Sequence, residues 1–492
     1  MLFGRSKESL HFEIMEKTAR LERVTGKEQQ VEIPSVWECL PVTEIGENAF
    51  YGNGKVKTLI LPESVTAIGG SAFRGCADLE EICLPESLEV LGDYAFSGCK
   101  NLREIRLPNG IKELSNGLFS KCRSLKKLIV PMGVTSIGEE VFDGCASLEL
   151  VVLPEGLEKI GENAFRNAGP DLRVVLPSKL PELNEHVFDG VSYIYNRAPD
   201  GLRLLMYGGH DTRLILDDRI ENVPVTEIGP RVFAMFAYLE SIKLPSELKR
   251  IGEKAFAGCE ELEELDIPDS VESIDSGAFI ACGFRSLKLP EEMTELQSEV
   301  LRGCENMVEL RLGSKLDSIW EHALEGCVNL TGLDLPDTLE VIADNAFTGL
   351  ARVESLRISE KVRVIGEEAM AFMTSLREIC VDERNDCFEV RQDCLIEKQS
   401  GRLIQCILTR ESPVIVPEGV KSIGFSAFAG SRAVRIELPE SVECVEDWAF
   451  RACKAEKIVI KNGNTQLGNA VFLNAERAQI DAPREVLEKI GE

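Results

Sequence analysis

Cysteine is the residue type whose spacing in this chain most readily suggests chemistry. Of the 16 cysteines, nine lie three residues after a recurring apolar anchor residue, usually phenylalanine. These nine are Cys76, Cys99, Cys122, Cys145, Cys259, Cys282, Cys304, Cys327 and Cys453. If the copies stack, the thiols form a ladder with neighbours about 5 Å apart, within reach of disulfide or metal chemistry. However, Phe236, Leu350 and Met373 take the same slot in other copies, and a ligand site would not accept them. We therefore expect small buried side chains that fill the interior.

Another group of cysteines departs from this pattern. Cys380, Cys387 and Cys394 are seven residues apart, and Cys406 lies nearby. Zinc sites usually pair cysteines two to four residues apart, so this spacing does not favour a metal. A disulfide within the segment is an alternative, and free thiols are the default expectation.

Other catalytic patterns are missing from the sequence. None of the four histidines, His11, His186, His210 and His322, belongs to an H-E-x-x-H pair, and the chain has no Walker loop and no G-x-G-x-x-G. Most carboxylates recur at outward slots of the repeat, which is typical of a solvated surface. The sequence therefore predicts no enzyme, no catalytic or metal site and no cofactor.

The elements that must position these residues follow a period of 22 or 23 residues. The anchors form three series, which are listed here in order: Phe50, Phe73, Phe96, Phe119, Phe142, Phe165 and Phe188; Phe233, Phe256, Phe279, Leu301, Leu324, Phe347 and Met370; Phe428, Phe450 and Phe472. Residues 72–94 show the unit, AFRGCADLEEICLPESLEVLGDY, in which Leu79, Ile82 and Leu84 are expected to point inward and Glu81 and Cys83 outward. One unit cannot bury its own apolar side, so the copies must stack.

The repeat resembles the leucine-rich repeats of the bacterial Treponema-type, BspA-like family, whose signature is I-G-x-x-A-F-x-x-C-x-x-L-x-x-I-x-L-P. The resemblance covers residues 31–475. It implies a leucine-rich repeat solenoid, β-rich or α+β, with a parallel β-sheet on one side. It also implies a cell-surface adhesin that binds host matrix proteins or other bacteria.

Three irregular stretches interrupt the period. Residues 12–33 and 388–409 each read as two alternating strands joined by a glycine-containing turn. The expected segments are an N-terminal hairpin cap and array start (1–49), a first array of seven repeats (50–192), a hairpin insert (193–232), a second array of seven (233–385), another insert (386–427), a third array of three (428–480) and a C-terminal cap (481–492). The cap is expected to be a short helix with Asp481 as its N-cap.

Charge and targeting signals restrict the partner. The net charge of −28 disfavours nucleic acid and anionic membrane surfaces. The first twenty residues show no secretory signal. The sequence contains no run of 18 apolar residues, so it predicts no membrane insertion. We expect a cytoplasmic protein; the alternative is a cell-surface or secreted one whose signal has been removed.

The outward strand positions, eight and ten residues after the anchor, are the expected binding surface. In the second array they alternate in charge, as on an ordinary wet surface. The first array instead predicts an apolar patch with basic flanks, formed by Lys127, Ile129, Leu150, Val152, Arg173 and Val175. The alternatives are that β-branched residues simply suit strands, or that an insert or a second subunit covers the patch.

The predicted function is a non-catalytic protein–protein interaction scaffold. The alternatives are the adhesin and, third, an enzyme or ligand-binding protein with a site in an insert. The sequence does not identify the protein partner or the oligomeric state.

Overall fold

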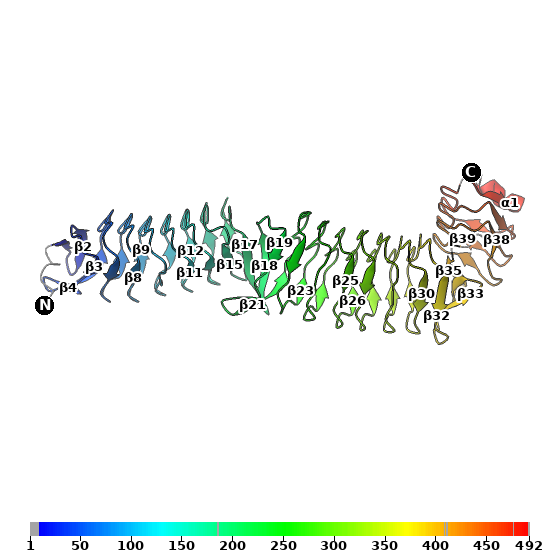
Figure 1. The fold of residues 1–492 in the computed structure, drawn as a ribbon, viewed down its shortest axis with the longest axis horizontal. Coiled ribbons are helices and arrows are strands. Elements are labelled where there is room, and N and C mark those ends of the chain that lie inside the picture. Colours follow the sequence, from blue (N-terminus) through cyan, green and yellow to red (C-terminus); the bar gives the residue numbers. More distant parts are fainter. Residues whose placement is uncertain (1–8, 185, 408, 410–411, 476, 491–492) are drawn as a thin grey trace. The chain divides into compact units, whose positions relative to one another are not determined.

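The computed structural model describes residues 9–490 except 185, 408, 410, 411 and 476. The chain divides into two compact units, residues 1–210 (unit 1) and 211–492 (unit 2). Each unit is a stack of coils, and Figure 1 shows the short strands of successive coils lying side by side within each stack. Nearly all regular structure is β-strand.

Most regular coils contribute two short strands, which stack into two columns. Column A contains the L-x-x-I-x-L strands and column B the L-x-x-I-G strands. In the coil that begins at Ala72, Leu79 and Ile82 are buried while Glu81 and Cys83 are exposed, as their alternation predicts. The anchor segment then bonds to the next coil, since Phe73 N donates to Ala95 O at 2.8 Å.

In unit 1, both columns are parallel, because each strand repeats the direction of the coil before it. Column A consists of β3 (Gln30–Glu32), β6 (Thr58–Ile60), β8 (Glu81–Cys83), β11 (Lys127–Ile129), β13 (Leu150–Val152) and β15 (Arg173–Leu176). Column B consists of β5 (Leu40–Ile45), β7 (Ala67–Ile68), β9 (Val90–Leu91), β10 (Glu113–Leu114), β12 (Ser136–Ile137), β14 (Lys159–Ile160) and β16 (Glu182–Leu183), and β4 (Val36–Trp37) pairs with β5.

Unit 2 repeats this arrangement. Column A consists of β19 (Arg213–Ile215), β22 (Ser241–Lys243), β25 (Ser286–Lys288), β27 (Glu309–Arg311), β30 (Ser355–Ile358), β32 (Glu378–Val381), β36 (Val414–Ile415), β38 (Arg435–Leu438), β40 (Lys457–Ile460) and β42 (Gln479–Asp481). Column B consists of β21 (Val223–Ile228), β23 (Arg250–Ile251), β24 (Ser273–Ile274), β26 (Glu295–Leu296), β28 (Ser318–Ile319), β29 (Val341–Ile342), β31 (Val364–Ile365), β37 (Ser422–Ile423), β39 (Cys444–Val445) and β41 (Gln466–Leu467), and β20 (Arg219–Ile220) pairs with β21.

The anchors form the expected hydrophobic spine. In unit 1, ring centroids of successive phenylalanines from Phe50 to Phe188 lie 5.0–6.1 Å apart. The cysteines three residues further on are buried free thiols, as predicted. In unit 1, each donates its S–H to a backbone carbonyl of a preceding coil, as Cys99 does to Phe73 O at 3.2 Å. The carbonyl removes the cost of burying the thiol without a partner.

The irregular stretches contain antiparallel strand pairs, but the turns differ from those expected. β1 (Leu10–Ile14) and β2 (Ala19–Val24) are joined by residues 15–18, so Gly26 lies outside the turn. β17 (Tyr193–Ala198) pairs with β18 (Gly201–Tyr207). The 388–409 stretch has three strands rather than two: β33 (Phe388–Arg391), β34 (Cys394–Glu397) and β35 (Arg402–Cys406).

In unit 2, the third insert adds its strands to column B of the coils that follow, because β35 pairs in parallel with β37. The Ser426 hydroxyl donates to Glu368, and the Arg451 guanidinium lies 5.3 Å from the centre of the Phe372 ring. These contacts join the coil anchored by Met370 to the coils anchored by Phe428 and Phe450, about sixty residues later in the sequence. The stack of anchor rings begins again at Phe428, whose ring centroid lies 5.1 Å from that of Phe450.

At the C-terminal end, α1 (Arg484–Ile490) packs its buried Val486 on the last coil. Asp481 is the last residue of β42, and Ala482 and Pro483 separate it from the start of the helix at Arg484. Asp481 is therefore not the N-cap residue. Among the described residues, no helix has the length and apolar content that crossing a bilayer requires.

Cys394 and Cys406 form a disulfide, which corrects the expectation of free thiols at these positions. They are directly paired across β34 and β35, with Cα atoms 4.3 Å apart. Antiparallel pairing brings together two residues that the sequence separates by 12.

A thiol titration tests this disulfide. With 16 cysteines in the chain and one disulfide, the fully unfolded protein should show 14 reactive thiols without reductant and 16 after reduction. Ellman's reagent in guanidinium chloride gives the count, and alanine at both Cys394 and Cys406 should make the two values equal. Sixteen thiols in protein purified without reductant would contradict the disulfide.

Candidate functional site

The apolar patch predicted in the first array is smaller than expected. Ile129 is 52% exposed and Leu150 is half-buried, but Val152 and Val175 are buried, at 9% and 2% exposure. Val152 and Val175 are therefore not accessible to a partner, although their positions in the repeat predict exposure. That expectation is wrong for these two residues. Lys127 and Arg173 are half-buried. A contact surface of Lys127, Ile129, Leu150 and Arg173 stays a prediction.

The second insert contributes to this burial. β17 pairs in parallel with β15 and places Tyr195, which is fully buried, beside Val175. Arg197 extends back to Glu155, in the turn after β13, with an N–O distance of 3.0 Å. The Arg173 guanidinium lies 5.0 Å from the centre of the Tyr193 ring. An aspartate at Val152 would therefore destabilise the fold rather than test binding, because it would bury a charge.

In the second array of unit 2, by contrast, the outward positions of column A are exposed, whereas those of β38 and β40 further along are half-buried. Seven consecutive coils present two such positions each. They are Ser241 and Lys243, Glu264 and Asp266, Ser286 and Lys288, Glu309 and Arg311, Gly332 and Asp334, Ser355 and Arg357, and Glu378 and Cys380. Leu265, Leu287 and Leu310, which alternate with them, are buried. The inner side chains fix the register, and the outer ones are available to a partner.

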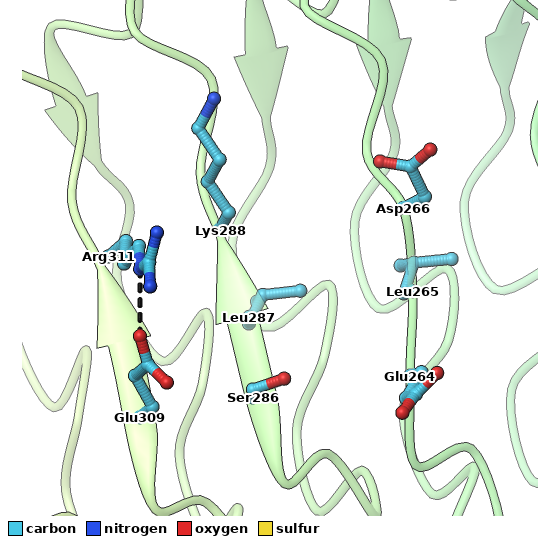
Figure 2. A pocket seen from close by; sticks show the side chains of 8 residues that line it. All are labelled: Glu264, Leu265, Asp266, Ser286, Leu287, Lys288, Glu309 and Arg311. Carbon is cyan, nitrogen blue, oxygen red and sulfur yellow. Dashed lines mark hydrogen bonds and ion pairs between the residues drawn. The ribbon is translucent and has the colours of Figure 1, made fainter.

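A groove of about 410 Å³ opens on this face. It is lined by Glu264, Leu265, Asp266, Ser286, Leu287, Lys288, Glu309 and Arg311. Figure 2 shows the three coils side by side, with Glu264, Ser286 and Glu309 in one row, Asp266, Lys288 and Arg311 in a second, and Leu265 and Leu287 between the two rows.

The groove lies where column A is interrupted. Residues 264–266 lie between β22 and β25 but form no strand, so the ladder stops on both sides of them. Backbone groups that leave a ladder must bond to water or to a ligand. A similar interruption at residues 104–106 of unit 1 underlies a groove of about 550 Å³. Both grooves thus offer backbone donors and acceptors beside charged side chains.

The charges of the unit 2 groove are unequally satisfied. Arg311 pairs with Glu309 of its own strand at 2.7 Å, and Lys288 lies 3.9 Å from Asp269. Within the part of the chain that the structure describes, Glu264 and Asp266 have no ion pair. The groove therefore presents two uncommitted carboxylates beside two exposed cations.

Sequence reasoning classed this face as ordinary wet surface. Alternating charge along a column indicates a solvated surface, but it does not show where the ladder of strands is interrupted. The missing strand could not be found from periodicity, since the E-L-D of residues 264–266 follows the same inward and outward pattern as the E-L-R of β27.

Comparison with known proteins matches the repeat over most of the chain. Six copies of the region described as "BspA type Leucine rich repeat region" match residues 43–172, 226–350, 276–396 and 406–492. No curated protein matches.

Several solved structures are similar to the chain. The T. pallidum leucine-rich repeat protein TpLRR is 32% identical over 37% of this chain and 86% of its own, with a TM-score of 0.36. A leucine-rich repeat protein from Bacteroides ovatus is 21% identical over 97% of this chain and 98% of its own, with a TM-score of 0.31. A leucine-rich cell surface protein from Faecalibacterium prausnitzii is 24% identical over 76% of this chain and 93% of its own, also with a TM-score of 0.31.

Proposed function

This chain belongs to the BspA-type leucine-rich repeat family, and we propose that it is a non-catalytic scaffold that binds a protein partner through column A of unit 2. Solenoids of this kind present an extended surface on which each repeat adds one strip of side chains. The observation that carries the proposal is the uninterrupted exposure of both outward positions over seven coils. The groove at residues 264–311 is its central contact.

The groove favours an extended partner segment that carries a lysine or arginine. Glu264 and Asp266 have no ion pair within the described residues, whereas Lys288 and Arg311 have a carboxylate nearby. Exposed ion pairs of that kind contribute little to stability, so a partner replaces them at low cost. A cation placed between the two free carboxylates gains attraction without breaking an existing pair, and the open backbone at residues 264–266 supplies main-chain hydrogen bonds.

A peptide-display experiment tests the proposal. Linear peptides selected on the full chain should be enriched in lysine and arginine, and they should bind the Glu264→Lys/Asp266→Lys variant about tenfold more weakly or worse, since each tenfold corresponds to about 1.4 kcal/mol. Fluorescence polarisation with labelled peptides measures the change. Ser286→Trp fills the groove without changing its charge and should weaken binding as well.

The matched control is Glu440→Lys/Glu456→Lys, which makes the same change in net charge at exposed positions of the third array. It should leave the affinity of the selected peptides within a factor of about two. Equal loss in the control and the groove variant would mean that net charge, not the groove, governs binding. Selected peptides that bind the groove variants as tightly as the original chain would refute the groove as the contact.

The disulfide favours the exported alternative over the cytoplasmic one. Structural disulfides persist in oxidising compartments and are rare in the cytosol of mesophiles. We therefore infer a location at the cell surface or outside the cell. Fractionation of the native organism with thiol trapping tests it, and cytosolic protein with Cys394 and Cys406 reduced would contradict it.

A further inference from the structure

Unit 1 carries a compact basic surface in a chain whose net charge is −28. It comes from two consecutive coils and consists of Lys100, Arg103, Lys121, Arg123 and Lys126, all exposed. Backbone hydrogen bonds place the two coils in contact, since Ser124 N donates to Lys100 O at 3.1 Å and Lys126 N to Arg103 O at 3.2 Å. Five cations therefore lie within two rungs of the solenoid, in the loop that leads into column A.

Two acidic residues that border this surface are already paired. Glu80 accepts a hydrogen bond from Lys57 at 2.9 Å, and that bond is the main reason its pKa is lowered; the charge of the nearby Arg103 lowers it further. Glu149 pairs with Lys126 at 3.4 Å. Among the described residues, no ion pair involves Lys100, Arg103, Lys121 or Arg123. These four cations are available to a partner.

Lys121 is held in a backbone conformation that favours glycine. Its φ is +63°, in the left-handed region. The equivalent residues of the neighbouring coils are Gly98 and Gly144, with φ of +76° and +72°. A lysine in this slot carries a conformational cost that glycine avoids, and it gains no ion pair in return. Other copies also place a non-glycine residue at positive φ in this slot, among them Asn167, Met235 and Ala281, so the conformation is tolerated by the repeat.

The surface also has an apolar edge. Lys126 leads directly into β11, where Ile129 is 52% exposed, and the following turn exposes Met132 at 69%. Sulfated glycans and lipid headgroups offer charge but no side chains that would cover isoleucine and methionine. A protein segment that mixes acidic and apolar residues matches both parts.

We propose that this surface docks an acidic, partly apolar segment of a protein partner, with the four unpaired cations holding its carboxylates and Ile129 covering its apolar residues. The surface is separate from the unit 2 groove, so it does not depend on the groove's function.

The test uses the full chain and a labelled synthetic peptide in which glutamate alternates with leucine. The peptide should bind at physiological salt and lose affinity toward 1 M salt, where screening shortens the range of charge attraction from about 8 Å to about 3 Å. Lys100→Glu/Arg123→Glu should weaken binding about tenfold or more. Lys159→Glu/Lys179→Glu, which changes the same net charge at exposed positions of unit 1 outside this surface, should bind the peptide like the original chain.

Two further variants separate docking from folding and from other polyanions. Lys121→Gly should weaken peptide binding while the thermal transition stays the same or rises, because strain is relieved; a purely structural lysine would lower it. Ile129→Ser should weaken the glutamate–leucine peptide but not a heparin oligosaccharide. Absence of peptide binding would overturn the proposal. So would heparin or phosphatidylserine vesicles binding as tightly as the peptide and without sensitivity to Ile129→Ser.

Discussion

Replacement of Phe119 by alanine is expected to lower the free energy of unfolding of unit 1 by about 3–5 kcal/mol. The side chain is fully buried, and its ring centroid lies 5.8 Å from that of Phe96 and 6.1 Å from that of Phe142. The substitution removes the buried ring and leaves a cavity between two coils. It also removes both stacked aromatic contacts, each of which contributes about 0.5–1.5 kcal/mol beyond burial.

The effect of this substitution should be local in origin. In a stack of repeats, stability is approximately a sum of terms between neighbours, so a weakened rung divides the array. Urea unfolding of the full chain should show a transition at lower denaturant, and hydrogen exchange should accelerate first in the coils that contain Phe96 and Phe142. Phe119→Leu is the matched control, because Leu301 and Leu324 occupy the anchor slot elsewhere with full burial. A loss of unfolding free energy below about 1 kcal/mol for the alanine variant would contradict a stabilising role for the stacked rings. An equal loss for the leucine variant would contradict it as well.

The interior of the solenoid could be predicted from the sequence because the repeat imposes the same environment on every copy. Phe119, Leu125 and Leu128 must point inward once the coil closes, whatever the neighbouring sequence. The same reasoning assigned Cys122 to the interior, and the structure buries it.

The outer surface could not be predicted in this way, because its exposure depends on chain that does not repeat. Val152 occupies the same register as the exposed Ile129, yet it is buried. The difference arises two coils later, where β17 continues column A with Tyr195. The sequence of residues 150–152 alone does not predict that Val152 is buried.

Features that depend on the geometry between strands were also beyond the sequence. The groove follows from the missing strand at residues 264–266, and the disulfide follows from the pairing of Cys394 with Cys406. The sequence predicts two strands over 388–409, joined by one turn, and this prediction does not say which residues face each other across the strands. The third strand, β35, settles that register and brings the two sulfur atoms together.

Raising the pH above about 9 is expected to destabilise both units steeply through the cysteine ladder. Burial raises the pKa of Cys76 and of Cys304 to about 12, from 9.0. Burial also raises the pKa of the other ladder thiols well above the usual value; they are Cys99, Cys122, Cys145, Cys282 and Cys327. The folded state holds these protons more tightly than the unfolded state.

The sign of the pH dependence follows from that difference. Below pH 9 both states are protonated, and the contribution of the thiols to stability is fully present. Between 9.0 and about 12 the unfolded thiols ionise while the folded ones do not, so the free energy of unfolding falls. Each thiol contributes up to about 1.4 kcal/mol per pH unit in this window. With four ladder thiols in unit 1 the slope is several times that of a single group.

Urea unfolding measured from neutral to alkaline pH tests this expectation, and alanine at both Cys99 and Cys122 is the informative variant. It should be less stable at neutral pH, because two sulfur atoms are lost from the interior, and its stability should fall less steeply above pH 9. Iodoacetamide on the native chain should modify the exposed Cys39, Cys83 and Cys380 and leave the ladder unmodified until unfolding. Native labelling of Cys99 or Cys122, or an unchanged slope in the variant, would mean that the alkaline transition has another origin. If the ladder thiols stay protonated and unmodified in the native chain, they do not react with a partner, and binding must involve the outer surface.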